Sequence, residues 1–209
     1  MSQGAKTGLL VVLEGGEGAG KSTLARALAA KLADAGEDVI RVREPGGTAA
    51  GEAIRELLHQ PLSPWAETFA FLVARAQIVA EVIRPALDRG AVVICDRFEA
   101  STFAYQGFAR GLDLDRLRAA NTDATGGLQP DLTILLDLDP AIGLRRKHGE
   151  TEAIRTGLEA EEFHQRVREG YLAQFSAAQA GRWLKLDATG EPEEIAAEAW
   201  AAVEGMLAR

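Results

Sequence analysis

The stretch that decides the fold runs from residue 9 to residue 23: Leu9-Leu10-Val11-Val12-Leu13-Glu14-Gly15-Gly16-Glu17-Gly18-Ala19-Gly20-Lys21-Ser22-Thr23. Its first five residues form an apolar run of strand length, and residues 24–32 carry leucines four apart, as one face of a helix requires. Between them, residues 15–22 fit the pattern Gly-x-x-x-x-Gly-Lys-Ser/Thr, whose backbone N–H groups cradle phosphates at a helix N-terminus. The strand, glycine loop and helix together predict a site for a nucleoside triphosphate.

Two side chains of this loop have predicted tasks. Lys21 is expected to reach the β- and γ-phosphates, and the hydroxyl of Ser22 is expected to ligate Mg²⁺. The plainer interpretation is a glycine-rich turn without a ligand, which the flanking strand and helix make improbable.

Composition bounds the remaining possibilities. The 209 residues are 47% hydrophobic, which suits one domain spanning 1–209 with a sizeable core. The net charge of −8 argues against nucleic acid or a membrane surface as a partner. Cys95 stands alone, so no internal disulfide is expected. A short polar N-terminus and no apolar run of membrane-spanning length complete the expectation of a cytoplasmic protein.

Strand and helix patterns alternate along the chain, which predicts an α/β fold. After the first strand and helix we expect strands at 38–43, 91–96, 131–137 and 182–187. The helices are expected at 49–60, 64–89, 99–106, 113–124, 140–147, 159–179 and 191–207. Five strands joined by helical crossovers give a doubly wound, five-stranded parallel sheet with helices on both faces, which binds ligands at the carboxyl ends of its strands.

Polar residues collect where these strands end. Asp96 and Arg97 follow the third strand, where a carboxylate near Ser22 could hold Mg²⁺ and a guanidinium could bind a phosphate. A plain surface ion pair is the alternative. Asp137 and Asp139 follow the fourth strand, but an aspartate before a proline is also a natural helix start.

Four motifs occur in order along almost the whole chain, and together they resemble thymidylate kinase. The motifs are the glycine loop with an acid at Glu17, Arg43-Glu44-Pro45-Gly46-Gly47-Thr48, Asp96-Arg97-Phe98, and Ser101-Thr102-Phe103-Ala104-Tyr105-Gln106-Gly107. The resemblance implies a P-loop NTPase fold with a short mobile lid, ATP and Mg²⁺ as cofactors, and transfer of the ATP γ-phosphoryl group to dTMP.

The resemblance also assigns residues to the sugar and phosphate of dTMP. Glu17 matches the acid that contacts the 3′-hydroxyl group, and Arg97 matches the arginine that binds the acceptor phosphate. Arg43, Glu44 and Pro45 match the hexapeptide that lines the acceptor site. Taken alone, the hexapeptide could equally be an ordinary turn.

The base pocket is assigned in the same way. Phe71 resembles the ring that stacks on thymine, and Arg75 the donor to a base carbonyl. Four residues apart on a helix, the two share one face, although core packing of Phe71 and solvation of Arg75 remain the alternative. Ser101, Tyr105 and Gln106 fall on the segment that closes over the nucleoside and discriminates against other pyrimidines.

The lid is expected at approximately residues 145–158, after the fourth strand. Bacterial-type members of the family place a catalytic arginine there when the glycine loop lacks one, as it does here. Arg145, Arg146 and Arg155 are the candidates, and Arg155 could equally be a solvated helix residue. Adenine is expected between the lid and the loop at residues 187–189.

The sequence leaves two alternative functions open, and it also bears on the oligomeric state. A related kinase could act on another nucleotide or on a nucleoside, and a nucleotide-dependent switch or assembly NTPase could use the same loop without a small-molecule acceptor. Family members are usually homodimers, and the 64–89 helix offers Trp65, Phe69, Val73 and Val79 for an interface, although such faces are usually core.

Overall fold

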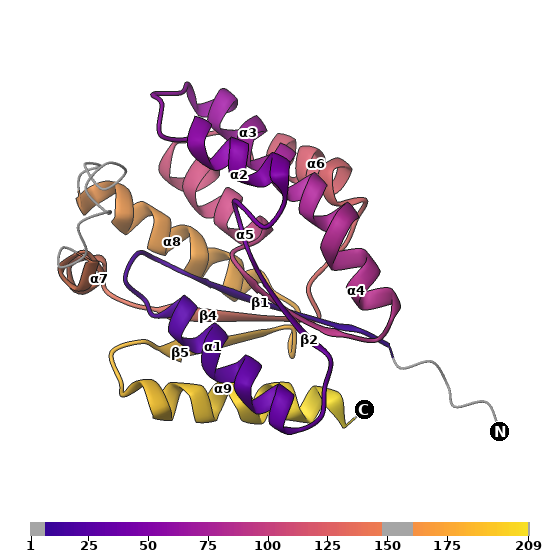
Figure 1. Cartoon of the computed structure of the whole chain (residues 1–209). Helices are drawn as coiled ribbons and strands as arrows, with labels where there is room; N and C mark the ends of the chain where they lie inside the picture. The colour runs from indigo at the N-terminus through magenta and orange to yellow at the C-terminus, as the bar shows by residue number, and fades with distance from the viewer. Residues whose placement is uncertain (1–6, 148–160, 209) are drawn as a thin grey trace.

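The structure, a computed structural model, describes residues 7–147 and 161–208. Five parallel strands form one sheet, as the sequence predicts, and their order in it is β2-β3-β1-β4-β5 (Figure 1). The strands are β1 (Leu9–Gly15), β2 (Val39–Arg43), β3 (Val92–Asp96), β4 (Leu132–Asp137) and β5 (Trp183–Asp187).

Helical segments connect every pair of consecutive strands. They are α1 (Lys21–Asp34), α2 (Ala49–Leu57), α3 (Pro64–Ile78), η1 (Val79–Ile83), α4 (Arg84–Asp88), α5 (Glu99–Thr102), η2 (Phe103–Ala109), α6 (Leu114–Thr125), α7 (Pro140–Lys147), α8 (Glu161–Ala177) and α9 (Pro192–Leu207). The expected 64–89 helix is therefore one continuous run with a π-helical turn, η1, in its middle. A second π-helical stretch, η2, extends the predicted 99–106 helix.

The sheet buries both of its faces, which is why its inner strands are apolar almost throughout. On one face, Val11 and Leu13 of β1 pack with Leu28 of α1 and with α9. On the other face, Leu10 and Val12 pack with the α3–η1–α4 run. A third cluster joins α5, η2 and α8 through residues such as Tyr171. Figure 1 shows α1 and α9 below the sheet, the helices α2 to α6 and α8 above it, and α7 at its left end.

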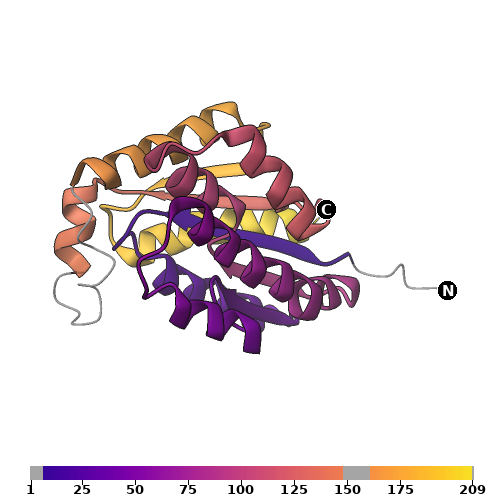
Figure 2. The ribbon, with the colours of Figure 1, turned by 90° about the horizontal axis from the view of Figure 1, so that it is seen from above.

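The carboxyl ends of the strands point toward α7, and both termini lie at the opposite end of the molecule (Figure 2). Because all five strands run the same way, the residues that follow them meet along one edge. The glycine loop after β1, Glu44 after β2 and Arg97 after β3 are thereby brought together. Within the described ranges, no helix is long and apolar enough to cross a bilayer.

Candidate active site

The glycine loop adopts a conformation that its sequence makes possible. Gly15, Gly18 and Gly20 have φ angles of 142°, 67° and 91°, which residues with a Cβ rarely adopt. Gly20 also serves as the N-cap of α1 without a capping side chain, and the first turn of α1 contains no acidic residue. The N-terminal N–H groups of α1 are therefore left for an anion.

Lys21 lies inside this loop and is 8% exposed. Its Nζ donates to the carbonyl oxygens of Gly15 at 3.0 Å and Gly16 at 2.7 Å. Burial, followed by the nearby positive charge of Arg97, lowers the pKa of Lys21 to about 8. Nucleotide phosphates would supply the negative charge that this buried ammonium lacks, so the loop is electrostatically prepared for them.

Ser22 and Asp96 form the predicted pair at the end of β3. The Ser22 hydroxyl donates to the Asp96 carboxylate at 2.8 Å, although 74 residues separate the two in sequence. Among the described residues no cluster of three or more His, Cys, Asp or Glu could hold a metal ion. One hydroxyl and one carboxylate nevertheless fit Mg²⁺, which usually keeps several waters and takes further ligands from substrate phosphates.

Arg97 lies next to this pair and contacts the glycine loop. Its Nη2 is 3.4 Å from the Glu17 carboxylate and 3.3 Å from the Tyr105 hydroxyl, over whose ring the guanidinium lies at 5.1 Å. Its Nη1 donates to Ser101 at 3.1 Å and to Tyr171 at 3.0 Å. Desolvation and the arginine charge act in opposite directions on Tyr105, and desolvation dominates, raising the pKa of this phenol to about 12. Three of the predicted residues, Glu17, Ser101 and Tyr105, thus meet around the guanidinium of a fourth, Arg97.

The sequence analysis assigned no role to Glu14 or Tyr171, which belong to the same group. Glu14 is the last side chain of β1 before the loop, and a charged residue in an otherwise apolar strand is a signal that could have been used. Tyr171 comes from α8, and no local pattern marks it.

Arg75 differs from its predicted role. It is 1% exposed, and its Nε donates to Glu44 at 2.7 Å. Its Nη1 donates to Thr102 at 2.7 Å and to Asn121 at 2.9 Å, and its Nη2 donates to the carbonyl of Phe98 at 2.9 Å. Every guanidinium nitrogen is engaged inside the protein, so this arrangement does not support the predicted bond to a base carbonyl or the solvated alternative.

Glu44 and Gln106 are likewise turned inward. Burial raises the pKa of Glu44 to about 7, against the opposing effect of the Arg75 charge. Its second oxygen, Oε1, is buried without a hydrogen-bond partner. Gln106 is 2% exposed and donates to Glu67 at 2.6 Å. Gln106 and Glu44 are thus held inside the protein, by Glu67 and Arg75, and their expected contacts with the substrate stay predictions.

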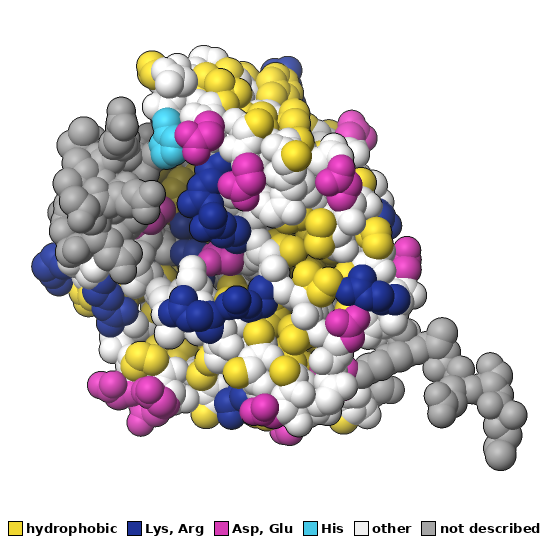
Figure 3. Space-filling view, in the orientation of Figure 1, with side chains coloured by type: hydrophobic (Ala, Val, Ile, Leu, Met, Phe, Trp, Pro, Cys, Tyr) yellow, Lys and Arg dark blue, Asp and Glu magenta, His cyan; other side chains and the backbone are white. Residues whose placement is uncertain are grey.

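Phe71, Arg43 and Pro45 remain accessible near this edge. Arg43 is exposed, and Phe71 and Pro45 are half-buried. Lys and Arg side chains gather in a hollow on the face seen in Figure 3, with acidic side chains among them. The positive charge needed for phosphates is therefore local, on a chain whose net charge is −8.

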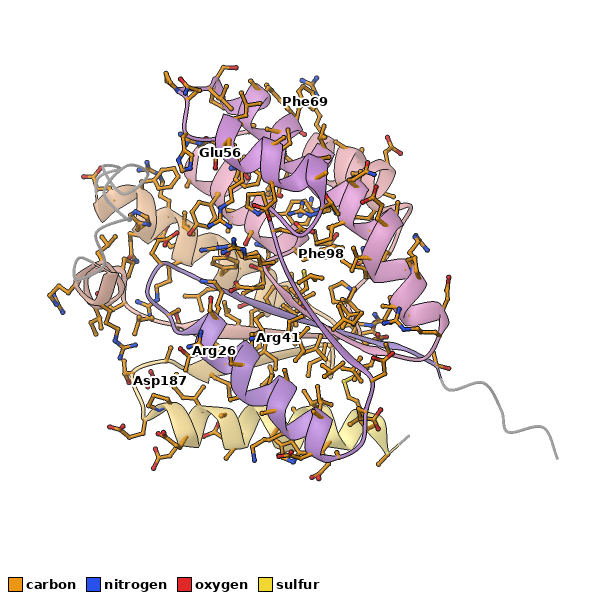
Figure 4. All side chains as sticks on the ribbon, viewed as in Figure 1. Arg26, Arg41, Glu56, Phe69, Phe98 and Asp187 are labelled. Carbon is orange, nitrogen blue, oxygen red and sulfur yellow. The ribbon has the colours of Figure 1, made fainter. Side chains whose placement is uncertain are left out.

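Two of the three lid candidates can be placed. Arg145 and Arg146 lie on α7 and are exposed, and Arg146 Nη1 donates to the carbonyl of Ala188 at 2.9 Å. Arg155 and most of the predicted lid lie outside the described residues. Asp187, the last residue of β5 and the neighbour of Ala188, is labelled in Figure 4.

The two aspartates after β4 have structural roles. Asp137 accepts a paired interaction from Arg168 of α8 at 2.7 and 3.2 Å. Asp139 accepts from the N–H of Ala141 at 2.9 Å and so caps the start of α7. Asp139 therefore has the helix-start role offered as the alternative, whereas Asp137 forms an ion pair with α8.

The glycine loop and α7 touch through two glycines. A Cβ on Gly143 would lie 2.1 Å from the carbonyl oxygen of Glu17, and one on Gly18 would lie 2.2 Å from the carbonyl oxygen of Gly143. Backbone packs directly on backbone here, so neither neighbour can yield by turning a side chain. Because Gly18 and Gly143 have no side chains, α7, which leads into the predicted lid, can pack directly on the phosphate-binding loop.

Replacing Gly143 by alanine should displace either α7 or the loop. Because a displacement of about 1 Å at reacting groups can cost about 10²-fold, we expect a loss of kcat/KM for ATP of that order. The matched control is Gly205→Ala, since a Cβ at Gly205 in α9 meets nothing within 4 Å. That variant should keep full activity and gain about 0.5–1 kcal/mol in free energy of unfolding. Steady-state kinetics with varied ATP, together with urea unfolding, make the comparison; full activity of Gly143→Ala would show that the contact is dispensable.

Known proteins resemble this chain over nearly its whole length. The sequence model of the family described as "Thymidylate kinase" matches residues 13–199. Thymidylate kinase of Deinococcus radiodurans is 48% identical over 199 residues, covering 94% of this chain and 96% of that protein. Thymidylate kinase of Synechococcus sp. (strain JA-3-3Ab) is 49% identical over 203 residues, covering 95% and 97%.

A solved structure agrees with these sequence matches. The crystal structure of thymidylate kinase from Ehrlichia chaffeensis superposes with a TM-score of 0.78 at 28% sequence identity, covering 94% of this chain and 99% of that one. The sequence resemblance is therefore confirmed, and the switch or assembly NTPase is set aside. With the glycine loop, the Ser22–Asp96 pair and Arg97 at one edge of a five-stranded parallel sheet, the chain belongs to the thymidylate kinase family.

Proposed function

We propose that this protein transfers the γ-phosphoryl group of ATP to dTMP and releases ADP and dTDP, a step of dTTP biosynthesis. The observation that carries the proposal is the position of Arg97 beside the glycine loop. Its Nη2 is 3.4 Å from Glu17, and its charge reaches Lys21 strongly enough to lower the pKa of Lys21. Lys21, which begins α1, and Arg97, which follows β3, suit a donor and an acceptor phosphate respectively.

The chemistry asked of these residues is mainly alignment and charge screening. Lys21 would hold the β- and γ-phosphates of ATP, and Arg97 would hold the phosphate of dTMP in line with them. Mg²⁺, held by Ser22 and Asp96, would neutralise phosphate charge when bound. The acceptor phosphate is already an anion near neutral pH, so no side chain has to remove a proton from it.

A lid arginine would add positive charge at the transferring group. Of the two candidates that can be placed, Arg146 is bonded to the Ala188 carbonyl, beside the loop expected to meet adenine. Arg145 is exposed on the same helix and is the better candidate for the phosphoryl group. Arg155 remains the third.

Phe71 is proposed to stack on thymine, because it is half-buried and lies one helical turn before the buried Arg75 on α3. Replacing Phe71 by alanine should weaken dTMP binding by about 1–3 kcal/mol, as the loss of a stacked aromatic ring does. ATP binding should stay within about twofold of wild type. Isothermal titration with each nucleotide tests this; equal losses for both would show that Phe71 is only core.

A homodimer is proposed through α2 and α3. The three large apolar side chains that stay exposed in the described residues are Leu57, Phe69 and Val73, at 44%, 56% and 51%, and all come from these two helices, which pack together. Figure 4 shows Phe69 on the outer side of α3, away from the sheet. Val79 is 2% exposed and belongs to the core, so its predicted place in the interface is wrong.

Replacing Phe69 by glutamate should convert the dimer into a monomer, because it puts a charge into the centre of an apolar patch. Sedimentation velocity measures the assembly state directly. Ala30→Glu is the control, since Ala30 is exposed on α1, which covers the opposite face of the sheet. A wild-type protein that sediments as a monomer, or a Phe69→Glu variant that remains a dimer, would exclude this interface.

The reaction itself is tested by its products. Incubation with ATP, Mg²⁺ and dTMP should give ADP and dTDP in equal amounts when the nucleotides are separated by anion-exchange chromatography. ADP without dTDP would mean hydrolysis and would contradict the proposal.

A further inference from the structure

Arg97 is held in an unusual backbone conformation. Its φ angle is 73°, and it is the one non-glycine residue in the described ranges with a positive φ. A left-handed conformation is unfavourable for a residue with a Cβ, so the surrounding structure must compensate for it. The backbone N–H of Arg97 donates to the Leu13 carbonyl at 3.0 Å, which joins it to the end of β1.

The next residue of β1, Glu14, fixes the segment around Arg97. Glu14 is fully buried and accepts four hydrogen bonds. Its Oε1 accepts from the backbone N–H groups of Phe98 at 2.9 Å and Ser101 at 3.1 Å. Its Oε2 accepts from the hydroxyls of Ser101 at 2.6 Å and Tyr171 at 3.1 Å. Burial raises the pKa of Glu14, while these bonds and the charge of Arg97 favour its ionised form.

The hydroxyl hydrogens of Ser101 and Tyr171 must point away from Arg97. A guanidinium has no acceptor, so neither Ser101 nor Tyr171 can donate to Arg97. Ser101 donates to Glu14, and Tyr171 donates to Glu14 or to the Ser101 oxygen 2.8 Å away. Both oxygens therefore present lone pairs to Nη1 of Arg97, at 3.1 and 3.0 Å, and occupy both of its hydrogens.

The opposite nitrogen of Arg97 is held more loosely. The contacts of Nη2 with Tyr105 and Glu17, at 3.3 and 3.4 Å, are longer than the 2.7–2.9 Å usual for charge-assisted bonds. Nη1 is thus fixed by two hydroxyl oxygens. Nη2 can exchange its two long contacts for phosphate oxygens.

We propose that Tyr171 and Glu14 are positioning residues for the reaction: Tyr171 accepts directly from Nη1 of Arg97, and Glu14 orients the hydroxyls of Ser101 and Tyr171, so that Nη2 is presented to the phosphate of dTMP. Tyr171 reaches this point from α8, 74 residues beyond Arg97, so α8 becomes part of the acceptor site. Neither residue touches the substrate. The inference rests on the proposed role of Arg97 toward dTMP.

The test is Tyr171→Phe, which removes one oxygen atom and keeps the ring that packs edge-on against Tyr105 at 6.4 Å. Loss of one acceptor from a charged donor should weaken dTMP binding about 10-fold. Thymidine lacks the phosphate, so its dissociation constant should stay within about twofold of wild type, as should that of ATP. Isothermal titration with dTMP, thymidine and ATP measures all three.

Two further variants separate positioning from general damage. Phe175→Leu alters the same helix and the same apolar cluster without a bond to Arg97, so it should lower the melting temperature and leave dTMP affinity unchanged. Glu14→Gln places an amide N–H₂ among four donors, so it should weaken dTMP binding at least as much as Tyr171→Phe does.

The outcomes distinguish this inference from the proposed function. Wild-type dTMP affinity in Tyr171→Phe, with impaired Arg97→Ala, would overturn the positioning role alone. Equal weakening of dTMP and thymidine by Tyr171→Phe would also overturn it, because the effect would then be on the whole pocket. A wild-type protein that does not bind dTMP would instead contradict the proposed function.

Discussion

Replacing Lys21 by alanine should lower kcat for dTDP formation by about 10³-fold, the loss typical of removing a preorganised charge from the transition state. The ammonium group already occupies the glycine loop, bonded to the carbonyls of Gly15 and Gly16. Phosphates can replace these carbonyls as its partners without a large movement. The loss should fall on kcat more than on dTMP affinity, because Lys21 serves the donor side.

The matched control for this change is Lys31→Ala. Lys31 is exposed near the end of the same helix, and its Nζ lies 5.7 Å from the Trp200 ring. Lys31→Ala removes one positive charge, as Lys21→Ala does, and should leave kcat unchanged. A folded Lys21→Ala enzyme with the turnover of Lys31→Ala would remove Lys21 from the mechanism.

The lowered pKa of Lys21 offers a second measurement of the same role. Lys21 loses its proton near pH 8 in the free protein, below its ordinary value of 10.5, and bound phosphates should raise the pKa again. Between these two values, ATP binding should therefore take up a proton at Lys21. Titration calorimetry at pH 8.5 in buffers of different ionisation enthalpy should detect the uptake, which should fade toward pH 7 and be absent in Lys21→Ala.

Replacing Arg97 by alanine should lower kcat/KM for dTMP by about 10²–10³-fold. The Arg97 guanidinium lies between the glycine loop and the end of β3, with Nη1 bonded to Ser101 and Tyr171 and Nη2 near Glu17. Arg97→Lys should recover only part of the loss, because a single ammonium cannot be clamped at one nitrogen and bind phosphate with another.

Arg89→Ala is the control for Arg97. Arg89 pairs with Asp38 at 2.9 Å on the surface, where such pairs contribute little to stability. Its loss should leave dTMP kinetics unchanged, so a comparable defect in both variants would point to net charge as the cause. A folded Arg97→Ala enzyme with normal turnover and normal dTMP affinity would exclude Arg97 from the acceptor site.

The fold could be predicted closely because it is determined by patterns that are local in sequence. Apolar runs of strand length, glycines between strand and helix, and helical periodicity gave five strands and their connections in the right order. The two π-helical turns, Val79–Ile83 and Phe103–Ala109, could not be predicted in this way. A π-helical turn depends on tertiary packing, which helical periodicity does not contain.

Site residues that lie in or next to a sequence motif could be predicted. Contacts between residues that are distant in sequence could be predicted less well. Ser22 and Asp96 were paired in advance because parallel strands place their carboxyl ends at one edge. Arg75 was expected to serve the base because the family resemblance implied it, and its helical spacing from Phe71 permitted it. Its hydrogen bonds to Glu44 and Asn121, which lie 31 and 46 residues away, cannot be seen in the sequence.

Tyr171 is a residue of the site that the sequence did not predict. It carries no motif, and its contact with Glu14 spans 157 residues. Such a contact follows from the way α8 packs over η2 and the sheet, which only the assembled structure reveals. Side chains that position a catalytic group are therefore the part of an active site that sequence patterns miss most readily.

The most direct measurement is the rate of ADP release from ATP and Mg²⁺ with dTMP, dUMP, dCMP, dGMP, dAMP or thymidine offered separately as acceptor. Fast turnover with dTMP, weak turnover with dUMP and none with the others is the predicted result. Preference for another acceptor, or ADP release that is indifferent to all six, would contradict the assignment of Arg97 and Phe71 to a dTMP site.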